Sequence, residues 1–493
     1  MKTKRFFLFF AAFFAFFVLS SCGKEPPRDV TVRFSASPSY YGEVRGNTEQ
    51  ILKGGAASEW VTAVPNNGFV FREWSDGVTE ARRADEHFDA DTELVAYFEP
   101  EACELPIFAF NMPSGDEVTS KTEYTPVTLH ITNTDEKYCL KNAGGLLRGR
   151  GNATWKLMEK KSYKLKLDEK ENLLGAGRGK AKQWVLLANH CDQTMLRNYL
   201  AFYLGSHLEG LEYTTSANFV EVYINGDYKG VYLLCEQTQI HKNRVNVEED
   251  PEKTDTGYLI ELDQYADDDE GNKEGETYFT AGGELYSFKQ KVTPEQCEFI
   301  KNYVTETDKA IMGGKRGEVE KYIDLASCVD MYLVQEYMMN IDVGWSSFFM
   351  YKKADDKLFF GPVWDFDLAA GNDGRLENGG YEGIYVGEDY GFTQSSRWYI
   401  ALMKQSWFRE LVKNRWEEKK DLFKGTSAEA RRTADSMKNA VKRNYERWDV
   451  FGKKINQEPS GVVVLPNYDA HLNHLCSWLD GRFEWLDAYF KNN

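Results

Sequence analysis

The stretch from residue 340 to residue 372, NIDVGWSSFFMYKKADDKLFFGPVWDFDLAAGN, constrains this chain more than any other part of it. Two short apolar runs, 348–351 and 358–360, are separated by the polar residues 352–357. Apolar runs of this length on either side of a polar turn predict a β-hairpin. A hairpin brings its two ends together, so residues before and after it are expected to face a common cleft.

Acidic residues flank this predicted hairpin: Asp342 precedes it, and Asp365 and Asp367 follow it. One carboxylate that accepts a proton and another that holds a metal ion are the minimum equipment for phosphoryl transfer. Acids also mark the solvated ends of strands, so a buried hairpin with water-exposed acids is an alternative interpretation. A carbohydrate-active enzyme is a further alternative, which requires Asp342 and Asp365 to lie across a sugar-sized cleft.

Length and composition predict a globular protein with two domains or more. The chain has 493 residues, of which 42% are hydrophobic and 14% aromatic. Single cores stop growing beyond about 250–300 residues. The net charge of −17 argues against a general nucleic-acid binder, which would carry a basic face. We therefore expect no nucleic-acid partner, although a local basic pocket for a nucleotide is compatible with this charge.

The first 22 residues predict a targeting segment that is not part of the fold. A positively charged start precedes an apolar run, 6–19, that is too short for a comfortable membrane span. The run ends in Leu-Ser-Ser-Cys, and the small residues before Cys22 resemble a bacterial lipobox, in which the cysteine is lipidated. A plain signal peptide is the alternative. We expect an exported lipoprotein of the bacterial cell envelope, anchored to the membrane through Cys22, with residues 23–29 as a tether.

Residues 30–100 predict a separate, small all-β module. Apolar and polar residues alternate in 30–34 and again in 94–98. Between them, the sequence AVPNNGFVFREWSDG, 63–77, is similar to a bacterial surface repeat that looks like a β-grasp spacer. No acid–base pair or metal-ligand cluster occurs in its sequence, so we assign it a spacer or binding role.

A basic cluster beyond residue 100 has the composition of a phosphate-binding loop. In the sequence RGRGN, 148–152, the glycines are expected to let the backbone approach a ligand closely. Arg148 and Arg150 supply planar donors that suit phosphate. Lys164 lies on a predicted strand, 162–167, and points to the face opposite the apolar side chains. A basic turn followed by an amphipathic strand with its polar face in water is the alternative.

Local sequence patterns indicate roles for two further acidic residues, Glu236 and Asp192. The dipeptide Asn225-Gly226 between two apolar runs predicts a hairpin with a type I′ turn, and Glu236 ends its second strand. Glu236 is placed to pair with Lys164, as a glutamate does in protein kinases, or to be an exposed strand end. Asp192, two residues ahead of Thr194, is placed to cap a helix rather than to do chemistry.

The second half of the chain predicts mostly helices. Helical periodicity is expected from residue 294, notably over 323–340, 398–449 and 472–490. The glycine-rich stretch 371–391 has no periodicity, and we expect a mobile loop beside the site.

Four stretches in one order resemble the CotH family of spore-coat and secreted kinases. They are residues 148–152 with the strand of Lys164, Asp192 with Arg197-Asn198, the hairpin that ends at Glu236, and Asp342 with Trp364-Asp365-Phe366-Asp367. The similarity covers residues 105–490. It implies an α+β chain with an atypical, two-lobed, protein-kinase-like domain. It also implies ATP with Mg²⁺ or Mn²⁺, and a protein substrate that offers a Ser, Thr or Tyr hydroxyl.

The resemblance also implies roles for single residues. Lys164 is similar to the lysine that contacts phosphate, and Asp342 to the catalytic aspartate. Asp365 looks like the metal-binding aspartate, with Asp367 as a second candidate ligand. The other residues expected on the nucleotide side of the site are Arg148, Arg150 and Glu236.

One pair of positions departs from the family pattern. Family members often carry asparagines four and five residues after the catalytic aspartate, and protein kinases place a metal-binding asparagine at a similar offset. This chain has Ser346 and Ser347 there. Serine is a weaker metal ligand than an asparagine carbonyl. A pseudokinase that keeps the scaffold as a surface binding or structural protein is therefore the alternative to an active kinase.

Overall fold

The chain divides into two compact units, Met1–Glu99 and Pro100–Asn493. The computed structural model describes residues 28–39, 41–66, 69–100, 103–113, 115, 117–268, 271–376, 379–389, 391 and 395–493. The predicted signal segment, Cys22 and most of the predicted tether lie outside these residues. Among the described residues, no helix combines the length and apolarity that a membrane crossing requires.

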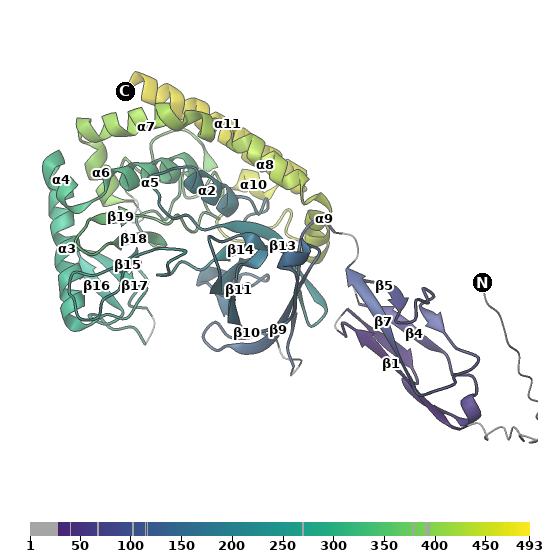
Figure 1. Cartoon of the computed structure of the whole chain (residues 1–493). Coiled ribbons are helices and arrows are strands. Elements are labelled where there is room, and N and C mark those ends of the chain that lie inside the picture. The colour runs from purple at the N-terminus through teal and green to yellow at the C-terminus, as the bar shows by residue number, and fades with distance from the viewer. Residues whose placement is uncertain are drawn as a thin grey trace, which may run out of the picture. The chain divides into compact units, whose positions relative to one another are not determined.

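The first unit consists of two small β-sheets (Figure 1). One sheet has the strand order β3–β1–β7–β5 and the other β2–β4–β6. The strands are β1 (Val30–Ser37), β2 (Gly42–Gly46), β3 (Glu49–Leu52), β4 (Val61–Pro65), β5 (Phe69–Trp74), β6 (Arg82–Arg83) and β7 (Thr92–Pro100). The predicted alternation is confirmed, since Val32 and Phe34 are buried while Arg33 between them is exposed. Within the described part of this unit the one helical segment is the 3-10 turn η1 (Lys53–Gly55), so the unit is all-β.

The second unit begins with a closed barrel of seven strands, in the order β10–β11–β12–β14–β13–β8–β9. The strands are β8 (Ile107–Asn111), β9 (Thr125–Thr132), β10 (Leu140–Arg150), β11 (Ser162–Glu171), β12 (Ala181–Leu187), β13 (Ala217–Ile224) and β14 (Asp227–Glu236). Alternate residues such as Leu129, Leu147 and Leu165 fill an apolar interior, as they do in small barrels. Asn225 (φ 50°) and Gly226 (φ 78°) both have positive φ, which confirms the predicted type I′ turn between β13 and β14.

A five-stranded sheet and most of the helices follow the barrel in the chain, and two helices, 153–157 and 197–206, lie between barrel strands (Figure 1). The sheet has the order β16–β17–β15–β18–β19. Its strands are β15 (Tyr258–Leu262), β16 (Tyr278–Ala281), β17 (Glu284–Phe288), β18 (Phe348–Lys352) and β19 (Leu358–Phe360). The helices are α1 (Ala153–Leu157), α2 (Arg197–Ser206), α3 (Pro294–Gly313), α4 (Arg316–Tyr322), α5 (Leu325–Met338), α6 (Arg397–Met403), α7 (Ser406–Lys424), α8 (Thr426–Asp435), α9 (Lys438–Arg447), α10 (Ser460–Val463) and α11 (Tyr468–Asn492). The predicted hairpin is confirmed as β18–β19, and the mixed composition of this unit makes the chain α+β.

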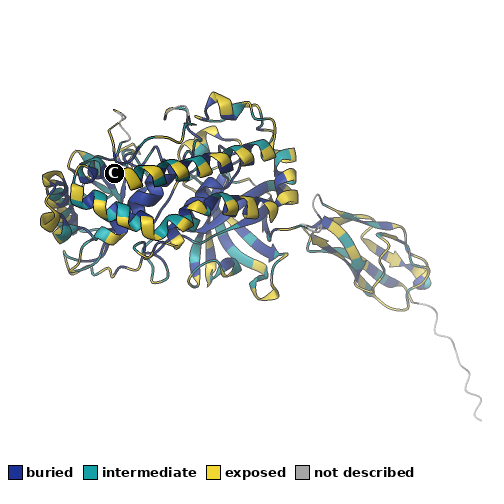
Figure 2. Cartoon of the chain, turned by 90° about the horizontal axis from the view of Figure 1, so that it is seen from above, coloured by how far each residue is buried: buried dark blue, intermediate teal, exposed yellow. Residues whose placement is uncertain are grey.

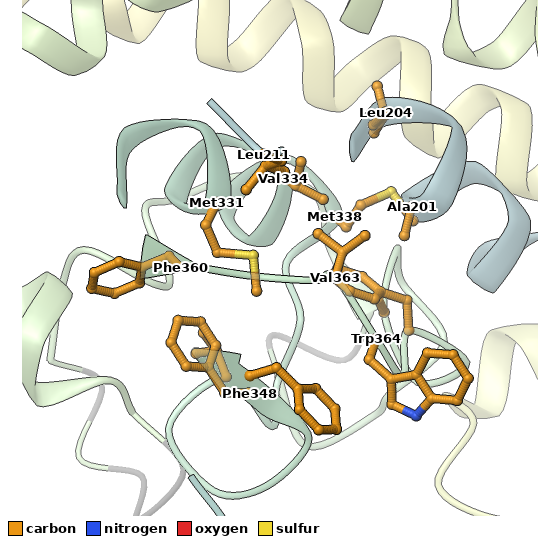
Figure 3. Close-up of a cluster of buried hydrophobic side chains, with 14 of the residues drawn as sticks. Ala201, Leu204, Leu211, Met331, Val334, Met338, Phe348, Phe360, Val363 and Trp364 are labelled. Atoms are coloured by element: carbon orange, nitrogen blue, oxygen red, sulfur yellow. The ribbon is translucent and has the colours of Figure 1, made fainter. Parts of the chain in front are cut away.

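The hairpin β18–β19 is held against α5 by an apolar core (Figure 3). Met331 and Met338 of α5 lie on the side of the helix that faces Phe348 and Val363 (Figure 3). These side chains are all buried. This packing fixes the chain immediately before and after the hairpin, where the predicted site acids lie. At the surface, α11 alternates buried and exposed residues along its length (Figure 2).

The segment after Gly371 is irregular, as predicted, but its described part is anchored rather than free. The carboxylate of Glu336, on α5, accepts hydrogen bonds from the backbone N–H groups of Tyr385, Val386 and Gly387 at 2.8, 2.8 and 3.1 Å. Arg482 of α11 pairs with Glu336 at 2.7 Å, and both side chains are buried. The buried Glu336–Arg482 pair therefore ties the backbone of residues 385–387 to two helices, and the mobility of this stretch stays a prediction.

Candidate active site

A cavity of about 580 Å³ is lined by residues of the barrel and of the segments around β18–β19. Such a volume is typical of sites for small molecules and cofactors. The predicted site residues in its lining are Arg148, Arg150, Lys164, Asp342, Ser346, Ser347, Asp365 and Asp367. Cations from the barrel thus share one cavity with carboxylates that lie about 200 residues further along the chain.

The cationic side of the cavity is built on β10 and β11. Arg148 and Lys164 are direct cross-strand partners, and the Arg150 guanidinium lies over the Trp364 ring, 5.4 Å from its centroid. Burial, together with the nearby charges of Arg148, Arg150 and Arg244, lowers the pKa of Lys164 to about 8. No carboxylate of the described residues forms an ion pair with Arg150 or Lys164. Cations gathered without a counter-charge form an anion-binding site.

A short strap, residues 120–122, lies beside this cluster. The Lys121 carbonyl accepts a hydrogen bond from Arg148, and Lys121 Nζ donates to Asn152 Oδ1 at 3.2 Å. The Ser120 carbonyl accepts from the Gly149 N–H at 2.8 Å. Lys121 therefore adds a further cation to the cavity lining. Sequence reasoning missed it, because this polar segment carries no motif.

The two glycines of the basic loop serve different purposes. Gly151 lines the cavity and has φ +93°, a conformation that L side chains rarely adopt. At Gly149, an added Cβ would lie 2.2 Å from the ring of Trp155. The expectation that both glycines make room for a ligand is therefore corrected: Gly149 makes room for a tryptophan.

Glu236 does not lie where the sequence suggested. It is fully buried, pairs with Arg244 at 3.4 Å and accepts a hydrogen bond from Tyr213 at 3.2 Å. The strand register explains why Lys164 does not reach it. Glu236 lies opposite Trp184, whose side chain is inside the barrel. Lys164 lies opposite Val185, the residue after Trp184, so its side chain points to the outer face. The expected Lys164–Glu236 pair is thus replaced by a pair with Arg244, and Glu236 is not among the cavity-lining residues.

On the acidic side, Asp342 lies before the hairpin with its side chain 30% exposed. Burial raises the pKa of Asp342 to about 6. Arg375, whose Nη2 lies 3.9 Å from Asp342 Oδ1, opposes this rise, while Asp365 and Asp373 add to it. A carboxyl group with a pKa near the working pH is suited to accept and release a proton.

Asp365 and Asp367 follow the hairpin and are held by buried polar side chains. Asn198 Oδ1 accepts from the Phe366 N–H at 2.7 Å, which fixes the backbone between the two acids. The Cys191 thiol donates to Asp367 Oδ2 at 3.1 Å. Burial, with Asp365 next, raises the pKa of Asp367 to about 7. Asp365 itself has φ +67°, a strained conformation for a residue other than glycine.

The donor set fits a divalent cation that arrives with a phosphate ligand. Asp365 and Asp367 form no ion pair with any Lys or Arg in the described part of the chain, so a cation would relieve the repulsion between them. Across the described residues, no group of three or more His, Cys, Asp or Glu side chains is arranged to hold a metal ion alone. Mg²⁺ is commonly bound by one or two carboxylates together with substrate phosphates and water, so this set suits Mg²⁺ with a nucleotide.

The Asp192–Arg197 pair positions this acidic segment from a distance. Asp192 Oδ2 accepts from the backbone N–H of Arg197, the first residue of α2, at 2.9 Å, but the N-cap residue of α2 is Leu196, so Asp192 contacts the start of the helix without being its cap. The buried guanidinium pairs with Asp192 and donates from Nε to the Ala369 carbonyl at 2.9 Å. α2 thus holds the loop that follows Asp367.

A further charged group at the C-terminal ends of β15 and β17 was missed by sequence reasoning. Glu261, Asp263 and Lys289 line the cavity. Lys289 pairs with Glu261, and Glu261 Oε1 accepts from the Ser347 N–H at 3.0 Å. Acids two residues apart in an otherwise apolar strand lie on one face of the sheet, and that pattern was the available signal.

The fold and cavity define an α+β protein in which a basic barrel face meets clustered carboxylates. The family model for the CotH kinase protein matches residues 147–486, more than half of the chain. The chain therefore belongs to the CotH family. The model for the divergent InlB B-repeat domain matches residues 32–102. No curated protein matches the chain.

Proposed function

We propose that this protein is an ATP-dependent protein kinase that transfers phosphate to hydroxyl groups of surface or periplasmic proteins. The observation that carries the proposal is that one cavity holds both Arg150 with Lys164 and Asp365 with Asp367, four charged residues that form no ion pair within the described part of the chain. Triphosphate and its metal need both halves at once. The family match supports a phosphotransferase.

The chain's own residues have distinct roles in this proposal. Arg148, Arg150 and Lys164 bind and orient the phosphates by charge-assisted hydrogen bonds. Asp342 takes the proton from the acceptor hydroxyl, for which its raised pKa suits it. A Mg²⁺ or Mn²⁺ ion held by Asp365, with Asp367 beside it, would supply positive charge to the phosphates. The barrel and the helical part act as the two lobes of a kinase-like domain.

Export and lipid anchoring through Cys22 are part of the same proposal. They rest on the lipobox-like sequence that ends at Cys22, and the surface-repeat match of the first unit is consistent with a cell-envelope protein. Replacing Cys22 by Ala should release the protein from the membrane fraction of cells. Equal membrane association of this variant would contradict the anchor and leave the kinase proposal untouched.

A pseudokinase is the second candidate function. It is favoured by Ser346 and Ser347, which stand where a second metal-binding side chain is expected and line the cavity. Such a protein would keep nucleotide binding and act as a surface binding module.

One experiment separates the two functions. Residues 23–493 are incubated with labelled ATP and either Mg²⁺ or Mn²⁺, alone and with cell-envelope proteins, beside the Lys164→Ala variant. The kinase proposal expects metal-dependent labelling that the variant loses. ATP binding without any transfer would support the pseudokinase, and absence of ATP binding would contradict both.

A further inference from the structure

The strap of residues 120–122 contributes a cation to which the proposed function gives no role. Lys121 lines the cavity and is half-buried. Its Nζ donates a hydrogen bond to Asn152 Oδ1 at 3.2 Å, and Asn152 lines the same cavity. The ammonium group of Lys121 is therefore held at the cavity wall, beside the basic loop 148–152, instead of extending away into solvent.

The backbone of the strap is held both within itself and against β10. Ser120 Oγ accepts a hydrogen bond from the Thr122 N–H at 3.1 Å, which closes a turn around Lys121. The Ser120 carbonyl accepts from the Gly149 N–H at 2.8 Å, and the Lys121 carbonyl accepts from Arg148. The Lys121 side chain thus starts from a backbone that is anchored to the barrel.

The protein does not neutralise the charge of Lys121. No carboxylate of the described residues forms an ion pair with it, and the Asn152 amide carries no charge. An ammonium group can donate more hydrogen bonds than the one made to Asn152. Arg148 differs, because its Nη1 is already engaged by the carbonyl oxygens of Lys121 and Gly149. Lys121 therefore offers both free donors and an uncompensated charge to an anion in the cavity.

We propose that Lys121 is a further phosphate-binding residue, which contacts the phosphate chain of the ligand that Arg150 and Lys164 also bind. The inference rests on the proposed function for the identity of that ligand as a nucleotide. A lysine binds phosphate as a point charge on a flexible stem. The stem lets the amine reach a phosphate oxygen from its position at Asn152, and the anion replaces or joins the amide as its partner.

The test removes the charge of Lys121 and compares the result with two matched variants. Lys121→Gln keeps the approximate length of the side chain without its charge, and Lys121→Arg keeps the charge. Lys156→Gln makes the same change in net charge at an exposed lysine of α1 that does not line the cavity. Calorimetry measures the binding of ATP and of inorganic triphosphate, each with Mg²⁺, to the wild type and the three variants.

Lys121→Gln should bind both ligands about tenfold more weakly, since a charged hydrogen bond to phosphate is lost. Lys121→Arg should lose less affinity than Lys121→Gln, and Lys156→Gln should bind both ligands as the wild type does. A wild type that binds triphosphate but not ATP would contradict the proposed function, and a loss of triphosphate binding in Lys121→Gln would still support the phosphate contact.

Other results would overturn the inference. Unchanged affinity of Lys121→Gln for both ligands would show that Lys121 does not touch the phosphates, and the proposed function would stand. An equal loss in Lys156→Gln would reduce the effect to net charge. A loss for ATP with unchanged binding of triphosphate would place the contact away from the phosphate chain. A wild type that binds neither ligand would overturn this inference and the proposed function together.

Discussion

The hydroxyl of Ser347 donates a hydrogen bond of 3.0 Å to Oδ2 of Asp365. Ser347 has φ +61°, a left-handed conformation that asparagine adopts more readily than most residues. The chain thus carries a short hydroxyl, in contact with the expected metal-binding carboxylate, where family members often carry an asparagine. Because Ser347 contacts Asp365, replacing Ser347 tests whether the missing asparagine cost the chain a second metal site.

Ser347→Asn should raise kinase activity and lower the Mg²⁺ concentration needed for half-maximal rate. The backbone already has a conformation that asparagine accepts, and the amide oxygen is a better metal ligand than the hydroxyl. Ser347→Ala is the matched control, because it removes the hydroxyl without adding a ligand, and it should show no such gain. Metal dependence that is identical in Ser347→Asn and the wild type would contradict a lost second metal site.

Removing the first unit should leave nucleotide binding intact. Residues 100–493 form a compact unit of their own, and each cavity-lining residue lies at or beyond Lys121. Calorimetry on residues 100–493 should give an ATP affinity within about twofold of that of residues 23–493. A folded truncation that no longer binds ATP would show that the first unit helps to form the site.

Asp342→Asn should stabilise the protein at neutral pH in the absence of metal. The folded-state pKa of about 6 lies above the ordinary value of about 3.9, so the folded state binds the proton more tightly than the unfolded state. Stability from this group is present below about pH 4 and falls as pH rises through about 6. The variant should gain about 1–3 kcal/mol at pH 7.5, the size of a shift of one to two units, and little at pH 4.

Thermal or urea unfolding at the two pH values measures this difference. Asp356→Asn, at the exposed tip of the β18–β19 hairpin, is the control and should change stability equally little at both. A gain in stability for Asp342→Asn that does not depend on pH would contradict a buried carboxyl group with a raised pKa.

Glu336→Gln should destabilise the second unit and loosen the loop beside the site. The substitution leaves Arg482 charged and buried with one partner lost, and such losses cost about 3–5 kcal/mol. Urea unfolding measures the free energy, and limited proteolysis should cut faster within 379–389. The control is Glu382→Gln, an exposed position in the same loop. Equal stability and cleavage rates for the two variants would show that the ion pair does not hold the loop.

Much of the local structure could be predicted because its causes are local. The β18–β19 hairpin follows from two apolar runs around a polar turn, and the turn at Asn225-Gly226 from residues that tolerate positive φ. The hydrogen bond that Asp192 accepts from the first residue of α2 agrees with a short polar side chain ahead of a helical repeat.

The parts that escaped prediction depend on contacts between distant segments. Glu236 pairs with Arg244 rather than Lys164 because strand register puts the two side chains on opposite faces of the barrel wall. Lys121 has ordinary local surroundings in the sequence, and only the closed barrel brings it into the lining of the cavity that also holds Lys164. Periodicity carries no information about such neighbours.

The central claim is that Asp365 serves the nucleotide and its metal, while Asp342 serves the acceptor hydroxyl. Calorimetric titration of ATP with Mg²⁺ into the isosteric variants Asp365→Asn and Asp342→Asn tests this division most directly. The account predicts that Asp365→Asn loses most of its ATP affinity. Asp342→Asn should bind ATP within a few-fold of the wild type, although its turnover falls about a hundredfold or more. Equal ATP affinity in both variants, whether retained or lost, would contradict the account.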